Sequence, residues 1–253
     1  MIIAHLLLDT PTLKAFSATC HSWYIATLPH LHHTLTLRDQ NSDPAYEGFK
    51  RLRKLAKLGL LPLVKRLWIQ QRFNSWFLPK SSNAWSLTYF AALTNLQELG
   101  VDGLDLYAFT PQAQLAYFGH LAPTLRSLIL GTPRGARPKL LYFLGLFPNL
   151  DDLKLVNDSY LAQEAPPDAA PIPQSTPSLR GRLVLTRWFG GQEFLKDLSA
   201  LSGGLRFRYM DLTDVESGCA RLLLDGCAES LKILRICPVN STGKRTSGGS
   251  SPV

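Results

Sequence analysis

The sequence predicts an α/β protein in which short parallel strands alternate with helices. An L-x-x-L-x-L pattern recurs along the 253 residues, and within each copy apolar residues alternate with other residues, as they do in a strand. Between the copies, apolar residues follow the three- and four-residue steps of a helix. A strand that is followed by a helix and another strand pairs in parallel with its successor, because the chain must cross back before it pairs again.

The strand pattern occurs often enough to be a repeat. The clearest copies span residues 60–70, 93–103, 121–131 and 146–156, and looser copies span residues 176–186, 206–213 and 227–237. Their central apolar residues, at successive spacings of 32, 29, 25, 30, 27 and 24 residues, are Leu67, Leu99, Leu128, Leu153, Leu183, Met210 and Leu234. One such unit cannot bury its apolar face alone, so we expect these residues side by side in neighbouring strands.

Apolar stripes between the strands predict the helices. In chain order they are Leu115, Phe118 and Leu121; Leu140, Leu141, Leu144 and Phe147; Phe194, Leu198 and Leu201; and Cys219, Leu222, Leu223 and Cys227. A further helix around residues 49–57 would turn Phe49, Leu52, Leu55 and Ala56 inward and keep a basic face in water. Residues 164–178 are rich in proline, alanine and serine and predict an exposed loop, and residues 240–253 predict a disordered tail.

The first 40 residues differ from the repeats. Two apolar helical stripes occur there, the first made of Ile2, Ile3 and Leu6 and the second of Leu13, Phe16, Cys20 and Trp23. Between them, Thr10 suits the N-cap of the second helix and Pro11 its first helical position. An H-x-x-L-x-L stretch at residues 32–37 then predicts a strand.

The string IIAHLLLDTPTLKAFSATCHSW at residues 2–23 resembles the F-box motif, most tellingly at Cys20-His21-Ser22-Trp23, and residues 60–237 resemble the leucine-rich-repeat family. The combination is common in fungal proteins of this type. The resemblance implies an F-box-like helical segment at residues 1–40, N-terminally truncated because the usual Leu-Pro opening is absent. It implies a leucine-rich-repeat-like solenoid at residues 41–239, with strands on the concave face and helices on the convex one. The repeat lengths vary and the asparagine ladder that closes each turn is mostly missing, so we expect uneven loops.

The same resemblance implies a substrate-recognition subunit of a cullin-RING ubiquitin ligase, which is not itself an enzyme. The residues that would pack the N-terminal segment or meet the Skp-family adaptor are Ile2, Ile3, Leu6, Pro11, Leu13, Phe16, Cys20 and Trp23. A target protein would bind the residues that alternate with the buried ones along each strand. These are Arg66, Trp68, Gln70, Glu98, Asp102, Asp152, Lys154, Arg182, Thr186, Tyr209, Asp211 and Arg235. Tryptophan, tyrosine and arginine dominate the energetics of protein interfaces.

Two other functions stay open. The N-terminal helices are also what a cap on the repeats would look like, which would make the protein a binding scaffold without a link to ubiquitin. The basic run from Lys50 to Arg66 would suit nucleic acid, but no nucleic-acid motif accompanies it. The net charge of +8 bears on solubility and association rather than on fold.

Metal, redox and catalytic motifs lack support. The cluster His30, His32 and His33 has no carboxylate or cysteine at ligand spacing, and Cys20, Cys219, Cys227 and Cys237 form no C-x-x-C pair. Neither a nucleophile elbow nor a P-loop occurs, so we predict no cofactor, metal or small-molecule ligand. No apolar run reaches the roughly 20 residues of a membrane span, and no leader is recognisable. Thiols without partners suit a reducing compartment, and we expect the cytoplasm or nucleus.

Overall fold

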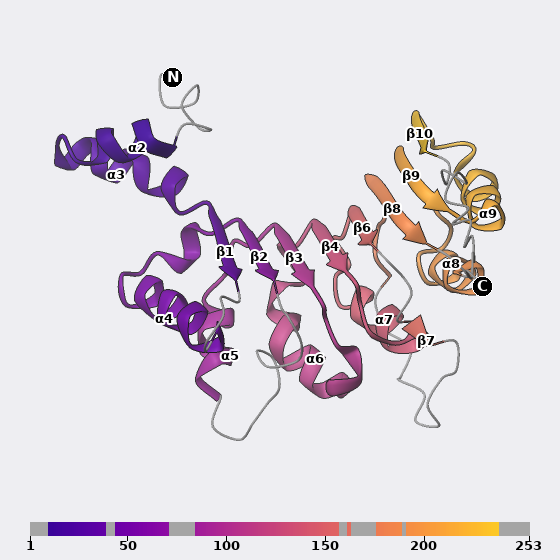
Figure 1. Ribbon diagram of the computed structural model, residues 1–253, viewed down its shortest axis with the longest axis horizontal. Helices are drawn as coiled ribbons and strands as arrows, with labels where there is room; N and C mark the ends of the chain where they lie inside the picture. The colour runs from indigo at the N-terminus through magenta and orange to yellow at the C-terminus, as the bar shows by residue number, and fades with distance from the viewer. Residues whose placement is uncertain are drawn as a thin grey trace, which may run out of the picture.

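The computed structural model describes residues 10–38, 44–70, 84–156, 161–162, 176–188 and 191–237. It confirms the predicted α/β class: eight strands form one sheet in which all neighbours are parallel. In sheet order these are β1 (Thr34–Arg38), β2 (Arg66–Gln70), β3 (Glu98–Asp102), β4 (Ser127–Gly131), β6 (Asp152–Val156), β8 (Arg182–Trp188), β9 (Tyr209–Val215) and β10 (Ile233–Cys237). This is also their order along the chain, so each strand is added beside the one before it (Figure 1). The short strands β5 (Gly135–Ala136) and β7 (Leu161–Ala162) form a separate parallel pair.

The helices divide into two groups (Figure 1). On one side of the sheet lie α4 (Pro44–Lys57), α5 (Ala84–Ala91), α6 (Pro111–Phe118), α7 (Arg137–Leu144), α8 (Gln192–Leu201) and α9 (Ser217–Cys227). Short 3-10 turns occur at η1 (Leu61–Leu63), η2 (Leu106–Ala108) and η3 (Gly119–Leu121). The helices α2 (Thr10–Ser17) and α3 (His21–Leu31) pack on each other beyond β1, away from the other helices. The sheet therefore has one covered face and one face free of these helices.

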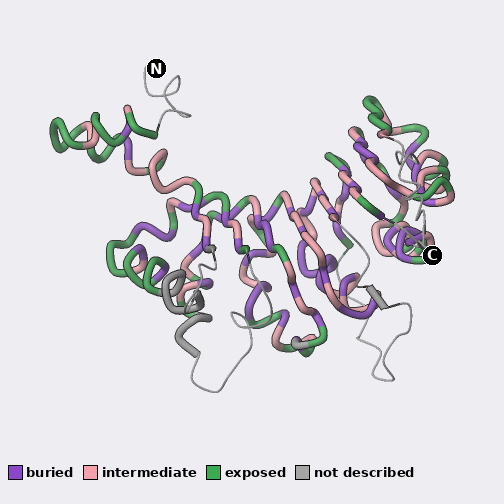
Figure 2. Tube along the Cα trace, viewed as in Figure 1, coloured by how far each residue is buried: buried purple, intermediate pink, exposed green. Residues whose placement is uncertain are grey.

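The predicted strand register is confirmed. Leu67 pairs with Leu99, Leu99 with Leu128 and Leu128 with Leu153 in neighbouring strands. The row continues through Leu183, Met210 and Leu234. Its members on β2 to β9 are at most 1% exposed, whereas Leu234 on the edge strand β10 is 40% exposed. Figure 2 shows the buried stretches recurring from strand to strand and in the helices that cover them.

A repeated hydrogen-bond pattern joins successive strands where they begin. The carbonyl of Lys65 accepts from the amides of Gln97 and Glu98 at 2.8 and 3.0 Å, and the carbonyl of Arg126 accepts from those of Asp151 and Asp152 at 2.9 and 3.0 Å. The carbonyls of His33, Gln97, Gly181 and Arg208 likewise each accept from two successive amides. These hydrogen bonds hold the first residues of a strand beside the start of the preceding strand, which fixes the register that the strands share.

Polar side chains in some of the turns add to this pattern. Asn95 donates to the carbonyl of Pro62 at 2.9 Å, and Asn149 donates to the carbonyl of Pro123 at 3.2 Å. Ser178, before β8, donates instead to the carbonyl of Leu150 at 3.1 Å. Within the described residues, asparagine therefore bridges successive turns at two places, in agreement with the expectation that the asparagine ladder is mostly missing.

The covering helices follow the predicted stripes with one exception. Phe118, Phe143 and Phe147 pack edge to face between α6 and the end of α7, with ring centroids 5.1 and 5.3 Å apart. Leu115 was predicted to face inward but is 54% exposed, because α6 buries Gln114, Tyr117 and Phe118 instead. On α4, Leu52 and Leu55 are buried while the five cations from Lys50 to Lys57 are exposed, as predicted.

The second N-terminal stripe is wrong at Cys20. That residue has extended backbone between α2 and α3, with φ of −159° and ψ of 165°, so it is not part of one continuous helix with Leu13 and Phe16. The hydroxyls of Ser17 and Thr19 bond to the carbonyls of Lys14 and Phe16, at 2.7 and 2.8 Å, and compete with helix continuation there. The predicted strand after the segment exists as β1 and belongs to the main sheet.

Some predictions fall outside the described residues. These are the first stripe of Ile2, Ile3 and Leu6, most of the proline-rich loop at residues 164–178, and the tail at residues 240–253. Among the residues that the structure describes, no helix is long and apolar enough to cross a membrane.

Candidate interaction surfaces

The open face of the sheet, by which we mean the side chains of β2 to β10 that alternate with the buried rows, is the first candidate. One row of this face runs Trp68, Gly100, Ile129, Lys154, Val184, Asp211 and Arg235 from β2 to β10. Because all neighbours are parallel and in register, residues from distant parts of the chain become adjacent here.

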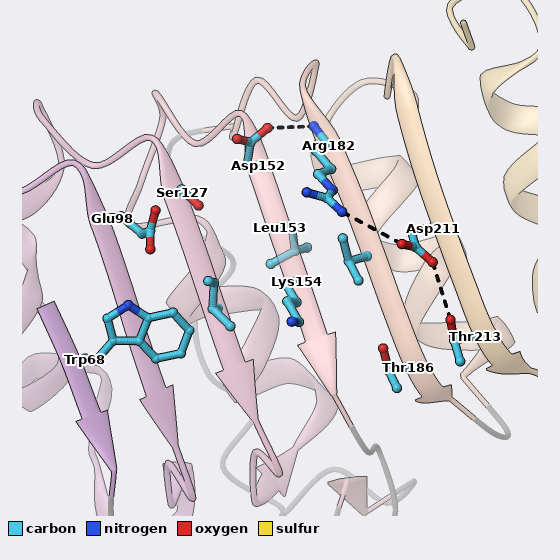
Figure 3. Close-up of a pocket in the computed structure, with 12 residues that line it drawn as sticks. Trp68, Glu98, Ser127, Asp152, Leu153, Lys154, Arg182, Thr186, Asp211 and Thr213 are labelled. Atoms are coloured by element: carbon cyan, nitrogen blue, oxygen red, sulfur yellow. Dashed lines mark hydrogen bonds and ion pairs between the residues drawn. The ribbon is translucent and has the colours of Figure 1, made fainter. Parts of the chain in front are cut away.

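A cavity of about 440 Å³ lies on this face and reaches from β2 to β9 (Figure 3). It is lined by Trp68, Glu98, Ser127, Ile129, Asp152, Leu153, Lys154, Arg182, Val184, Thr186, Asp211 and Thr213. The volume lies within the range of about 300–1,000 Å³ typical of ligand pockets. A cavity that crosses so many strands suits a segment laid across the sheet.

A tryptophan forms one end of the cavity. The indole of Trp68 lies over Gly100 of the next strand, where an added Cβ would stand 2.7 Å from the ring. Glycine is therefore required beneath the ring, and any larger residue would lift it. Ile129 follows in the same row on β4, so this end of the cavity is apolar.

A carboxylate organises the other end. Asp211 is only 8% exposed, and its Oδ2 lies 3.8 Å from a guanidinium nitrogen of Arg182 and 3.8 Å from one of Arg235. The hydroxyl of Thr213 donates to Asp211 Oδ1 at 3.3 Å, and the guanidinium of Arg182 stacks 4.5 Å from the ring centre of Tyr209. Both arginines are more than half exposed, so the ion pairs position the guanidiniums more than they stabilise the fold.

Three further carboxylates on the face are also engaged. Asp152 accepts from the backbone amide of Arg182 at 2.6 Å, and Gly181 leaves the room for it, since a Cβ there would meet that carboxylate. Glu98 lies 3.6 Å from the guanidinium of Arg66. At the rim, Asp102 accepts from the hydroxyl of Thr132 at 3.0 Å.

The structure brings together seven of the predicted partner-binding residues in the cavity: Trp68, Glu98, Asp152, Lys154, Arg182, Thr186 and Asp211. Arg66, Gln70, Asp102, Tyr209 and Arg235 lie on the same face without lining the cavity. The expected exposure is wrong for Asp211, because two arginines from the neighbouring strands cover it.

Sequence reasoning missed Ser127, Ile129, Val184 and Thr213 as lining residues. The strand alternation could have found Ile129 and Val184, since each stands between two buried leucines in its own strand. Being aliphatic, they lack the polar or aromatic groups by which binding residues are usually recognised in a sequence, although an apolar floor is common in binding pockets.

The second candidate is the N-terminal hairpin of α2 and α3. Phe16 and Trp23 stack with ring centroids 4.9 Å apart and an interplanar angle of 24°, which joins the two helices. Leu13 is 1% exposed, so it packs within the hairpin region and offers no surface to an adaptor. Tyr24 and Ile25 on α3 are 44% and 51% exposed, and these two residues were not predicted as contacts. Pro11 and Cys20 are exposed as well.

The histidines sit where the hairpin meets the sheet. His33 shares a hydrogen bond with the hydroxyl of Thr34 at 3.0 Å through Nδ1. Burial lowers the pKa of His32 and His33, and the neighbouring cations Arg51 and Arg66 lower them further. Both are neutral at pH 7 in consequence. Within the described ranges, no group of His, Cys, Asp and Glu could hold a metal ion.

The cysteines carry no bond to one another among the described residues. Cys219 and Cys227 are buried in α9, and burial raises the pKa of the Cys227 thiol. Both therefore behave as small core residues rather than as nucleophiles.

The chain was also compared with known proteins. No protein-family model matches it, and no curated protein matches its sequence.

Proposed function

We propose that the protein is a substrate-recognition subunit of a cullin-RING ubiquitin ligase, in which the α2–α3 hairpin binds a Skp-family adaptor and the open face binds the target protein. The observation that carries the proposal is the presence of two separate surfaces at different places in the fold. Tyr24 and Ile25 are exposed on a hairpin that stands apart from the other helices, while the cavity lies on the face of the sheet that those helices leave free. The F-box-like string at residues 2–23 supports the hairpin's role.

The repeat architecture belongs to the same proposal. We infer a leucine-rich-repeat-like solenoid whose open face is concave. In its support, the eight strands of the main sheet lie in chain order, and a carbonyl of the preceding unit accepts two amides at six of the seven strand entries from β2 to β10, the entry of β8 being the exception. Repeat proteins of this kind present extended binding surfaces, because each unit adds a few side chains to one face.

The mechanism is proximity. The protein itself supplies no chemistry; it holds a target and an adaptor at fixed positions on one rigid body. Holding the target near the carrier that is loaded with ubiquitin raises the effective concentration of the two reactants, which makes the transfer of ubiquitin effectively intramolecular. The rigidity comes from the shared core, whose buried leucines run from β1 to β9 without a break in register.

A second candidate is a repeat scaffold with no link to ubiquitin. The interruption at Cys20 and the burial of Leu13 favour it, since both remove residues from the predicted adaptor-binding stripe. In this alternative the hairpin caps the edge strand β1, and only the open face binds a partner.

Co-purification of the full chain with a Skp-family adaptor separates the two candidates. The proposed ligase subunit retains the adaptor, and Ile25→Asp, which places a charge on the exposed apolar surface of α3, abolishes retention. Leu58→Asp is the matched control, because Leu58 is 59% exposed beside α4 and should not affect the adaptor. Failure of the unmodified chain to retain the adaptor, or equal retention by Ile25→Asp, would leave the scaffold as the better account.

A further inference from the structure

The cavity contains a cation that has no counterion among the described residues. Lys154 lies half-buried in the middle of the open face, and the residues beside it in the same row are Ile129 and Val184. Within the described part of the chain, no hydrogen bond or ion pair engages its ammonium group. A charge held between aliphatic side chains has lost part of its hydration, so it gains from an anionic partner.

The carboxylates near Lys154 already have other hydrogen-bond or ion-pair partners. Asp152 accepts the backbone amide of Arg182, Asp211 faces Arg182 and Arg235, and Glu98 faces Arg66. Figure 3 shows the contacts of Asp152 and Asp211 with Arg182, while Lys154 lies among the residues that line the cavity without such a contact. Among the described residues no carboxylate is left for this cation, so a bound molecule is the partner that we infer.

The apolar end of the cavity, at Trp68, lies at a fixed distance from Lys154. Trp68 and Lys154 occupy the same row on β2 and β6, three strand intervals apart. Strands lie about 4.8 Å apart, so the two positions are separated by about 14 Å. An extended peptide advances about 3.3 Å per residue, so about four residues span this distance, and side chains four positions apart point to the same side.

The surrounding charge favours an acidic partner. Exposed basic residues gather where β8, β9 and β10 begin, namely Arg180, Arg206, Arg208 and Lys232, next to Arg182 and Arg235 on the open face. A cluster of one sign steers an oppositely charged segment toward the adjacent cavity.

We propose that the open-face cavity binds an extended acidic segment of a partner protein, with an aromatic or aliphatic side chain on Trp68 and Ile129 and a carboxylate, four positions further on, at Lys154. This inference deepens the proposed function by specifying the chemistry of the segment that the recognition surface takes. A protein segment fits better than nucleic acid, because it can bring a single carboxylate to Lys154 and keep its other side chains neutral, whereas a continuous phosphate backbone would also place negative charge against Glu98, Asp152 and Asp211.

Fluorescence anisotropy with labelled synthetic peptides tests the proposal. The probe is a 12-residue Gly-Ser peptide with one tryptophan followed four positions later by glutamate, and its companions place glutamine at the second position or put the two residues side by side. We expect saturable binding of the probe below 1 mM at low salt, and weaker binding of both companions. Lys154→Met should weaken binding of the probe about tenfold or more, because it removes a charge-assisted hydrogen bond. Lys57→Met, on the exposed face of α4, is the matched control and should leave it unchanged.

Three results would overturn the inference: no binding of the probe up to 1 mM, equal binding by Lys154→Met, or tighter binding of a 12-nucleotide single-stranded DNA under the same conditions. Adaptor retention by the same variants is measured in parallel. Retention of the adaptor without peptide binding removes this inference alone, whereas peptide binding without adaptor retention supports it and counts against the ligase role.

Discussion

Replacing one leucine in the middle of the buried row tests whether the sheet and its helices share one continuous core. Leu128 on β4 has 0% of its surface exposed and pairs with Leu99 and Leu153 on both sides. Leu128→Ala removes the transfer free energy of the deleted carbons and leaves a cavity that neighbours on two strands can only partly fill. We expect the free energy of unfolding to fall by about 3–4 kcal/mol.

The matched variant is Leu234→Ala in the same row. Leu234 is 40% exposed on the edge strand β10 and has a neighbouring strand only at β9 within the described residues. Leu234→Ala removes transfer free energy only for the part of the side chain that is buried, and it leaves no enclosed cavity. We therefore expect the free energy of unfolding to fall by about 1.5 kcal/mol. Urea unfolding followed by far-ultraviolet circular dichroism measures both. Equal losses, or a larger loss at Leu234, would mean that the buried row does not act as one core.

Three further predictions concern glycine packing, turn bonding and pH. Gly100→Ala should lower stability and weaken probe-peptide binding, because its Cβ would stand 2.7 Å from the Trp68 ring. On α9, Gly226→Ala should instead raise stability by up to about 1 kcal/mol, because its Cβ would lie 3.7 Å from the side chain of Leu205, an ordinary van der Waals contact. Thermal melting and anisotropy compare the two variants, and unchanged stability and binding in Gly100→Ala would contradict the packing. Asn95→Ala should cost about 1 kcal/mol in urea unfolding, because the Pro62 carbonyl loses its donor, while the adjacent exposed Thr94→Ala should cost less. Burial lowers the pKa of His32, His33 and His120, so the unfolded chain binds more protons near pH 6.5 than the folded one. The free energy of unfolding should therefore fall as the pH is lowered from about 7.5 to 5.5. The variant His120→Gln should show a smaller fall, and an unchanged dependence of the free energy of unfolding on pH would exclude His120 as a contributor.

The sequence predicted the strands better than the helices because strand positions are tied to one another. Every unit must place its central leucine against the next, so a misplacement at Leu99 or Leu153 would expose the whole row. No such rule sets which side of the helix α6 faces the sheet. In the structure α6 buries Gln114 and leaves Leu115 54% exposed. Spacing alone assigns a stripe to a helix but does not tell which of two adjacent residues faces the core.

The hairpin shows a different limit. The stripe from Leu13 to Trp23 has helical spacing, yet Cys20 stands between two helices. The signal for the break lies in Ser17 and Thr19, whose hydroxyls bond to carbonyls of the preceding turn. Such local competition between side chain and backbone is weak, so the sequence pattern does not decide whether the helix continues. Phe16 and Trp23 still meet, because the turn folds the second helix back onto the first.

The candidate site was the least predictable feature, because its properties arise between strands. Asp211 looks exposed in its own strand, and only the register places Arg182 and Arg235 on either side of it. The same register leaves Lys154 between Ile129 and Val184, with no acid in its row on either neighbour. Charge pairing on such a face depends on which residues of separate repeats share a row. A change of one residue in a single turn would shift a strand's partners and exchange one set of ion pairs for another, without altering the composition of the chain. Recognition by this face therefore follows from register as much as from residue type.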